Sequence, residues 1–395
     1  MKRWISVLAA LCLVIYLLPT PLQAAAATDT PTVTVYFSVS HDEDFRDGDG
    51  TGEVMALKEI TVPYFDLGLY GLQEFYFSSE SYGDDGDGLP GSDLAAGTKE
   101  FAEGKITMLH LFIYATEVYY CGEDPDQAGK GYLANEGLLG KGVMQISGSR
   151  GSLFFEQFWD RDLNFNYYHN FNYPLASAGW GSTADQILLH DGDVVTMGHF
   201  TDWNFYNDPD SIFNYIKAGD EKVHTTVTKG DQVELTIWRA GATENGDYNT
   251  GHVIVTSCPE VFITPIDEIE TDISNWTTLG TADANGSFTV DTSDLEPGRY
   301  MVAVPGQFGS SKELNESICS TPGAILMDVE PKPGDINDNG KNEPSDAAML
   351  YAIINSKYEA TETQVSAADV NGDGKVNAND AAMLYAAVNG KLQLP

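Results

Sequence analysis

The sequence predicts a multidomain chain. It consists of a small α+β domain at residues 28–215, an all-β sandwich at residues 217–330, and a C-terminal α-helical module of paired, EF-hand-like loop-helix units at residues 332–394. Three observations support this division. A long apolar segment lies among strand-like segments in the first part, period-two alternation split by Gly and Asn turns fills the second, and an internal repeat marks the third. A chain of 395 residues is long enough for two or three cores.

The first 26 residues have the features of a secretory signal peptide. Lys2 and Arg3 precede an apolar run that extends through Leu18, and small residues follow it. Cleavage after Ala24 or Ala26 fits the preference for small residues at such sites. The apolar run is short for a membrane span, and no charged stop-transfer flank follows it. We therefore expect an extracellular protein, secreted or held at the cell surface by a partner.

A formal net charge of −38 at pH 7 restricts the partners of this chain. Such a charge repels nucleic acid and anionic membrane surfaces, and it favours contact with cations such as calcium. We therefore expect no nucleic-acid partner, and no membrane span once the signal peptide is removed.

Three cysteines follow the signal segment: Cys121, Cys258 and Cys319. An odd number argues against a dense disulfide scaffold, and the absence of a C-x-x-C motif excludes a zinc ribbon. Cys258 and Cys319 flank one β-rich region, where they either pair or remain thiols.

The first domain combines strands with one helix. "PTVTVYFSVS" (residues 31–40) alternates apolar and polar side chains, as a strand does. "KITMLHLFIYATEVYY" (residues 105–120) is strongly apolar and free of Gly and Pro, which predicts a buried helix. "HDGDVV" (residues 190–195) predicts a strand-turn-strand with Gly192 at the turn.

The order of these elements resembles the bacterial surface domain that is similar to the C-terminal domain of transcobalamin. The shared marks are Gly131-Tyr132, an aromatic-x-Asn strand at Tyr167 to Asn172, and an L-x-x-G-D-x-V turn at Leu189 to Val194. The resemblance implies a small α+β domain with a sheet wrapped on one helix. The ligand of this family is generally unknown, and corrinoid binding does not carry over to this chain without matching residues.

Two clusters leave catalysis open in this domain. Glu156, Asp160 and Asp162 in "FFEQFWDRD" are candidate glycosidase carboxylates, but a solvated face beside a core stripe is the better explanation of the i,i+4 spacing of Glu156 and Asp160. A second group could form a metal or acid/base cluster, although the predicted turn explains its aspartates better; it comprises His190, Asp191, Asp193 and His199. Aromatic residues between Phe154 and Tyr173 either stack on sugar rings or pack in the core. No GxSxG, HExxH or P-loop motif accompanies them, so we assign no catalytic residue.

The middle region consists of alternating segments separated by Gly and Asn turns, which predicts an antiparallel sandwich. "ANGSFTVDTSDLEPGRYMVAV" resembles the Ig-like and prealbumin-like spacer domains of exported bacterial proteins, on Gly286, Phe288, Leu295, Pro297, Gly298 and Tyr300. Pro331 and Pro333 then form a stiff joint to the C-terminal module.

The C-terminal module is an internal repeat. "SDAAMLYAIINSK" and "NDAAMLYAAVNGK" match at 9 of 13 positions, and the preceding loops open with Asp335 and Asp369, 34 positions apart. Both loops have oxygen-bearing residues at positions 1, 3, 5, 9 and 12 of an EF-hand calcium loop, a backbone carbonyl at position 7, and glycine at position 6. The expected ligands are Asp335, Asn337, Asn339, Lys341, Glu343 and Asp346 in the first loop, and Asp369, Asn371, Asp373, Lys375, Asn377 and Asp380 in the second. The two lysines contribute their carbonyls.

A helix with one apolar stripe is expected after each loop, but none before it, because Pro331 and Pro333 would break such a helix. This loop-then-helix unit, repeated between Lys332 and Leu394, resembles the type I dockerin module. The resemblance implies two calcium ions and a cohesin domain of a scaffoldin as partner. Because a module of this size buries little apolar surface, we expect calcium to supply much of its folding free energy.

Carried over position by position, the resemblance assigns the cohesin-facing residues to the late loop and the exposed helix face. They are Pro344, Ser345, Tyr351, Ala352, Asn355 and Ser356 in the first repeat, and Ala378, Asn379, Tyr385, Ala386, Asn389 and Gly390 in the second. The two tyrosines replace the basic residues that are common in clostridial dockerins, so the contact should be more apolar.

Together these observations predict a secreted, non-catalytic component of a cellulosome-like, cohesin-dockerin assembly. Its N-terminal domain would bind either a carbohydrate or another cell-surface ligand, in the context of polysaccharide degradation. The alternative is a dockerin-borne polysaccharide hydrolase, a glycoside hydrolase whose catalytic domain has no recognisable motif.

Overall fold

The computed structural model describes residues 30–40, 54–77, 103–135, 143–159, 161–162, 165–172, 183–199, 213–240, 252–266, 276–304 and 323–394. The expected signal peptide at residues 1–26 and Cys319 lie outside these ranges. No helix in the described ranges is long and apolar enough to cross a membrane.

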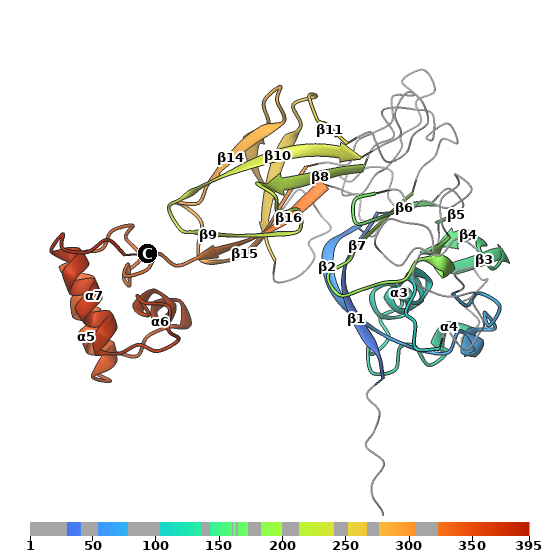
Figure 1. The fold of residues 1–395 in the computed structure, drawn as a ribbon, viewed down its shortest axis with the longest axis horizontal. Helices are drawn as coiled ribbons and strands as arrows, with labels where there is room; N and C mark the ends of the chain where they lie inside the picture. The colour runs from blue at the N-terminus through green and yellow to red at the C-terminus, as the bar shows by residue number, and fades with distance from the viewer. Residues whose placement is uncertain are drawn as a thin grey trace, which may run out of the picture. The chain divides into compact units, whose positions relative to one another are not determined.

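The N-terminal part contains a four-stranded sheet in the order β2-β1-β7-β6 (Figure 1). Its strands are β1 (Thr32–Ser40), β2 (Val54–Pro63), β6 (Phe165–His169) and β7 (Val194–His199). β1 pairs with β7 in parallel, whereas the other pairs are antiparallel. A second, three-stranded sheet contains β3 (Met144–Ser149), β4 (Ser152–Phe158) and β5 (Arg161–Asp162).

The predicted buried helix is confirmed as α3 (Met108–Ala115), which continues as a π-helical turn, η2 (Thr116–Tyr120). Every residue of α3 is buried, as its predominantly apolar sequence requires, and the buried set includes one polar residue, His110. A helix that is apolar all round must be covered on more than one side. The ring centroid of Phe112 accordingly lies 5.8 Å from that of Phe37 on β1 and 5.3 Å from that of Phe155 on β4. Both sheets therefore cover the helix.

The middle part contains two sheets that share one apolar core. The first consists of β8 (Phe213–Ala218), β10 (Gln232–Ala240), β11 (Val253–Ile254) and β14 (Ser287–Asp291). The second consists of β9 (His224–Thr228), β12 (Glu260–Pro265), β13 (Thr277–Thr281), β15 (Gly298–Val304) and β16 (Gly323–Glu330). Side chains such as Ile237 and Val302 from the two sheets meet in that core. One pair departs from the expected antiparallel pattern, since β9 and β16 run in parallel.

The expected boundary at residues 215–217 falls inside β8, which pairs with β10 from Phe213 onward. A further apolar cluster combines Leu57 and Val194 of the N-terminal sheet with Tyr215 and Leu326 of the middle sheets. The first two parts therefore bury side chains against each other, which the sequence pattern did not predict.

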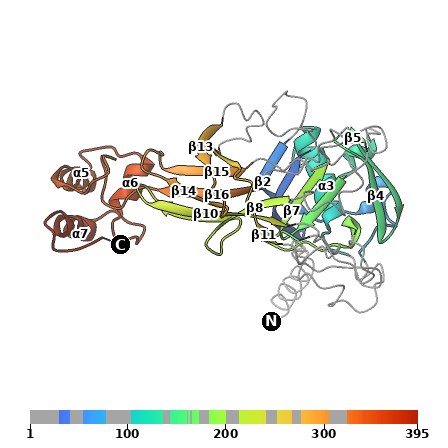
Figure 2. The same cartoon turned by 90° about the horizontal axis from the view of Figure 1, so that it is seen from above.

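The C-terminal module contains α5 (Pro344–Ile354), α6 (Glu362–Ala368) and α7 (Ala378–Val388) (Figure 2). α5 and α7 are the two predicted helices. Their small core contains Leu350 and Leu384, which occupy equivalent positions in the two repeats and are fully buried. Both helices contribute apolar side chains to this core.

The prediction that no helix precedes either loop is wrong for the second loop, because α6 ends at Ala368, directly before Asp369. The prolines that exclude such a helix lie before the first loop only. In the second repeat Thr361 caps α6 instead, and its hydroxyl accepts a hydrogen bond from the Gln364 N–H at 3.2 Å.

Candidate functional site

Position 1 of each C-terminal loop has the same geometry. The Asp335 carboxylate accepts hydrogen bonds from the backbone N–H groups of the residues four and five positions later, at 3.0 and 2.6 Å. The Asp369 carboxylate makes the equivalent bonds at 3.1 and 2.7 Å. Gly340 and Gly374 provide the second donor in each case, at positive φ angles of 83° and 78°. Glycine takes this conformation without strain, so the loop can close around its first carboxylate.

Position 12 is equally matched in the two loops. Asp346 and Asp380 are fully buried, and each lies in the first turn of the following helix. Each carboxylate accepts one hydrogen bond from the N–H of loop position 3 and one from that of position 9, at 2.8 to 3.2 Å. These two residues were predicted as metal ligands, and they also cap α5 and α7.

The remaining expected ligands are joined by hydrogen bonds within each loop. The Asn339 side chain donates to Glu343 Oε1 at 2.8 Å, and the Ser345 hydroxyl donates to the same oxygen at 3.0 Å. These bonds hold the pKa of Glu343 below its ordinary value. In the second loop the Asn377 side chain donates to the Lys375 carbonyl at 3.1 Å.

The donor set of the loops fits calcium, which prefers oxygen ligands. In the first loop the side-chain oxygen of Asn337, at position 3, is buried without a hydrogen-bond partner. Asp346 and Asp380 are buried carboxylates, and neither has a Lys or Arg partner within the described part of the chain. Both features are costly unless a cation compensates them.

No cluster of three or more His, Cys, Asp or Glu side chains is arranged for a metal within the described ranges. Each loop has three carboxylates among its six expected ligands, but they are not gathered into such a cluster. The other three ligands of each loop supply amide or main-chain oxygens, and the position-12 carboxylates point to backbone N–H groups.

Ten of the twelve expected cohesin-facing residues are exposed, and Ala352 and Ala386 are half-buried. Tyr351 and Tyr385 are large apolar side chains with 61% and 64% of their surface exposed. Two members of the set have a further role that the sequence did not reveal. The side-chain amides of Asn355 and Asn389 each donate to the carbonyl of the tyrosine four residues earlier, at 2.7 Å, so they cap the ends of α5 and α7.

Among the carboxylate candidates of the N-terminal part, Glu156 and Asp162 lie on strands and not on a helical face. Glu156 is on β4, and its Oε2 accepts a hydrogen bond from the Gln145 side chain at 2.7 Å. Asp160 and the side chain of Asp162 lie outside the described residues. The aromatic run is mainly core, because Phe155, Phe158 and Trp159 are buried, whereas Phe154 is 63% exposed.

The aspartates of the "HDGDVV" turn bind protein groups. Asp193 is buried and bonded to His169 Nε2 and to the Asn170 amide, both at 2.9 Å. Burial alone would raise the pKa of Asp193, but these hydrogen bonds outweigh it and hold the pKa below its ordinary value. Asp191 accepts the Thr34 N–H at 2.8 Å. The two sequence marks at residues 167–172 and 189–194 are therefore bonded to each other.

Of the two predicted histidines, His190 is exposed, and its Nδ1 lies 3.8 Å from the same oxygen of Asp193 that His169 contacts. The side chain of His199 lies outside the described ranges. His169, which the sequence did not single out, makes the shorter contact.

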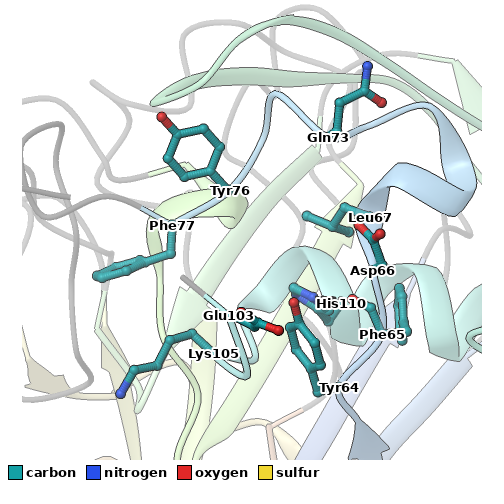
Figure 3. Close-up of a pocket in the computed structure, with 10 residues that line it drawn as sticks. All are labelled: Tyr64, Phe65, Asp66, Leu67, Gln73, Tyr76, Phe77, Glu103, Lys105 and His110. Atoms are coloured by element: carbon teal, nitrogen blue, oxygen red, sulfur yellow. Dashed lines mark hydrogen bonds between the residues drawn. The ribbon is translucent and has the colours of Figure 1, made fainter. Parts of the chain in front are cut away.

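A pocket of about 490 Å³ lies beside the N-terminal end of α3 (Figure 3). Two segments far apart in the sequence line it: one from Tyr64 to Phe77, the other from Glu103 to His110. His110 is buried; its Nδ1 lies 2.9 Å from the Thr107 hydroxyl, and its Nε2 lies 3.2 Å from the Phe65 carbonyl. Burial lowers the pKa of His110 to about 4, so this ring is neutral near pH 7. No periodic pattern or motif in the sequence pointed to this pocket.

Residues 333–389 match the family model of the dockerin type I domain. This match confirms the expected C-terminal dockerin. A dockerin of this type implies calcium binding and a cohesin partner, as in cellulosome-like extracellular assemblies. No curated protein matches the chain.

Proposed function

We propose that this protein is a non-catalytic component of a cohesin-dockerin assembly. It docks to a scaffoldin through its calcium-loaded C-terminal module, and its N-terminal domain presents a binding site in the context of polysaccharide degradation. The observation that carries this proposal is the duplicated loop-helix geometry, in which position 1 and position 12 make the same hydrogen bonds in both repeats.

Two calcium ions are proposed, one in each loop. The first would be held by Asp335, Asn337, Asn339, the Lys341 carbonyl, Glu343 and Asp346, and the second by Asp369, Asn371, Asp373, the Lys375 carbonyl, Asn377 and Asp380. Each ion would neutralise carboxylates that otherwise repel one another. It would also fix the start of the following helix, because position 12 belongs to that helix as well as to the loop.

The docking face is proposed to centre on Tyr351 and Tyr385. Exposed tyrosines supply apolar contact area together with a polar tip, and such residues are enriched in interface cores. Their equivalent positions in the two repeats give the module two similar faces. We therefore propose that a cohesin can bind in two orientations, related by exchange of the two repeats.

The test is capture of the full-length protein by immobilised cohesin domains, with calcium and with a chelator. Retention in calcium and release by the chelator are expected from at least one cohesin class. Capture that is equally strong in the chelator would contradict a calcium-dependent plug. A Tyr351→Ala, Tyr385→Ala double variant serves as the docking-face control, because neither side chain belongs to a loop or to the core.

A further inference from the structure

The pocket beside α3 combines aromatic surface with a polar margin. Tyr64, Tyr76 and Phe77 contribute the rings, and the polar groups come from Asp66, Gln73 and Glu103. Figure 3 shows Tyr64 and Tyr76 on opposite sides of the space, with the Glu103 carboxylate directed toward Tyr64. The volume of the pocket, about 490 Å³, lies within the range of about 300–1,000 Å³ that is usual for small-molecule sites.

Several of these groups are held in place from outside the pocket. The Arg150 guanidinium lies 4.5 Å from the Tyr76 ring centroid, and the Gln186 side chain donates to the Tyr76 carbonyl at 3.1 Å. Asp66 accepts the Gly68 N–H at 2.8 Å, which fixes its carboxylate at the start of η1 (Leu67–Tyr70). Tyr76 and Asp66 are thus held in place, and such preorganised groups favour a ligand of defined shape.

The charges of the pocket disfavour an anionic ligand. Asp66 and Glu103 are both acidic. The Lys105 side chain extends away from the other lining residues in Figure 3, and the Arg150 guanidinium lies against the Tyr76 ring. His110 supplies no positive charge near neutral pH, because burial lowers its pKa. The whole chain also carries strong negative charge.

A neutral sugar ring matches this lining better than other small molecules do. Its faces carry C–H groups, which pack on aromatic rings, and its edge carries hydroxyl groups, which donate to carboxylates and exchange hydrogen bonds with amides. We propose that this pocket binds a ring of a neutral oligosaccharide, with Tyr64 and Tyr76 as the aromatic contacts and Glu103 as an acceptor for sugar hydroxyls. This deepens the proposed function, since it names the ligand class of the N-terminal domain.

The test is calorimetric titration of the full-length protein with cellohexaose, xylohexaose and mannohexaose, and with choline chloride as a cationic probe. Binding of at least one hexasaccharide is expected, and Tyr76→Ala should weaken it about tenfold, the effect of one lost aromatic contact. Tyr76→Phe keeps the ring and should retain most of the affinity. Glu103→Gln keeps the shape of the side chain but removes its charge, and should weaken binding several-fold.

Phe154→Ala is the matched control, because Phe154 is an exposed aromatic residue outside the pocket. It should leave saccharide affinity unchanged. The proposal is overturned if no hexasaccharide binds, if only choline binds, or if Phe154→Ala weakens binding as much as Tyr76→Ala. Cohesin capture of the same variants separates the sugar-binding proposal from the docking proposal. The pocket variants should still be captured by cohesin, because the pocket lies outside the C-terminal module. A failure of sugar binding would therefore not count against docking.

Discussion

Replacing the first carboxylate of each loop provides the sharpest test of the calcium sites. Asp335 and Asp369 each hold two backbone N–H groups through one carboxylate. Asn has nearly the same shape, but it places an NH₂ group where one of the two oxygens accepts. The Asp335→Asn, Asp369→Asn double variant therefore removes one charged ligand from each loop and leaves an amide donor facing a backbone donor.

The loss can be bounded from the structure. A hydrogen bond to a charged group contributes about 1.5–3 kcal/mol, and one such bond is lost in each loop. If free calcium is about 100-fold above the dissociation constant, each filled site adds about 2.7 kcal/mol, which is lost with the ion. The two effects together exceed the roughly 3–5 kcal/mol that a core of this size supplies. The double variant should therefore leave the module unfolded, even in calcium.

Hydrogen exchange of the full-length protein, followed by mass spectrometry, reports on this module alone. In the unaltered protein, peptides that cover α5 and α7 should be protected in calcium and should exchange much faster in a chelator. In the double variant they should exchange fast under both conditions. Peptides from the middle sheets, such as β15 and β16, should not change.

The control is Asp338→Asn, which makes the same substitution once, at an exposed loop position outside the expected ligand set. Asp338 pairs with Lys229 at 2.7 Å, and loss of such a surface ion pair costs about 0–1 kcal/mol. Asn also tolerates the positive φ of 55° found at this residue. Full protection of α5 and α7 in the double variant, or equal loss in the Asp338→Asn control, would refute the assignment of position 1 as a calcium ligand.

Three further outcomes are expected. The Tyr351→Ala, Tyr385→Ala double variant should reduce cohesin affinity at least tenfold in calorimetry without changing the melting temperature, because both side chains are mainly exposed. Leu350→Ala, at a fully buried position, should destabilise the module by about 2–5 kcal/mol in denaturant unfolding. The folded-state pKa of His110 is about 4, below its unfolded value of 6.5, so acidification across that window protonates only the unfolded chain and costs roughly 3 kcal/mol. His110→Asn should flatten that part of the stability-pH curve, and an unchanged slope would contradict the burial of this ring.

The C-terminal module could be predicted because its information is local. Ligand spacing, glycine at position 6 and the apolar stripe all lie within one repeat, and the second repeat checks the first. α6 was not predicted, because the exclusion by prolines applies only to the first loop, and no proline lies directly before the second. The second repeat has Thr361 and Gln364 at the corresponding place, and these form a capping box.

The N-terminal part was less predictable because its important contacts are distant in sequence. Asn170 donates to Asp193 and also accepts the Val194 N–H at 2.9 Å, so two loose motifs prove to be one structural contact. The pocket joins residues near Tyr64 with residues near His110, and no periodic pattern links them. The parallel pairing of β9 with β16 is likewise a tertiary choice, which alternation along a strand does not determine.

The two calcium loops differ in a way that preserves their equivalence. The first has its third carboxylate at position 9, as Glu343, and the second has it at position 5, as Asp373. Each loop therefore offers three carboxylates to one divalent ion, although their placement differs. The number of carboxylates among the expected ligands is thus the same in both loops, although the first loop also contains Asp338, which pairs with Lys229. Tyr351 and Tyr385 have similar exposure at equivalent positions of the two repeats, and this similarity supports the proposal of two docking faces.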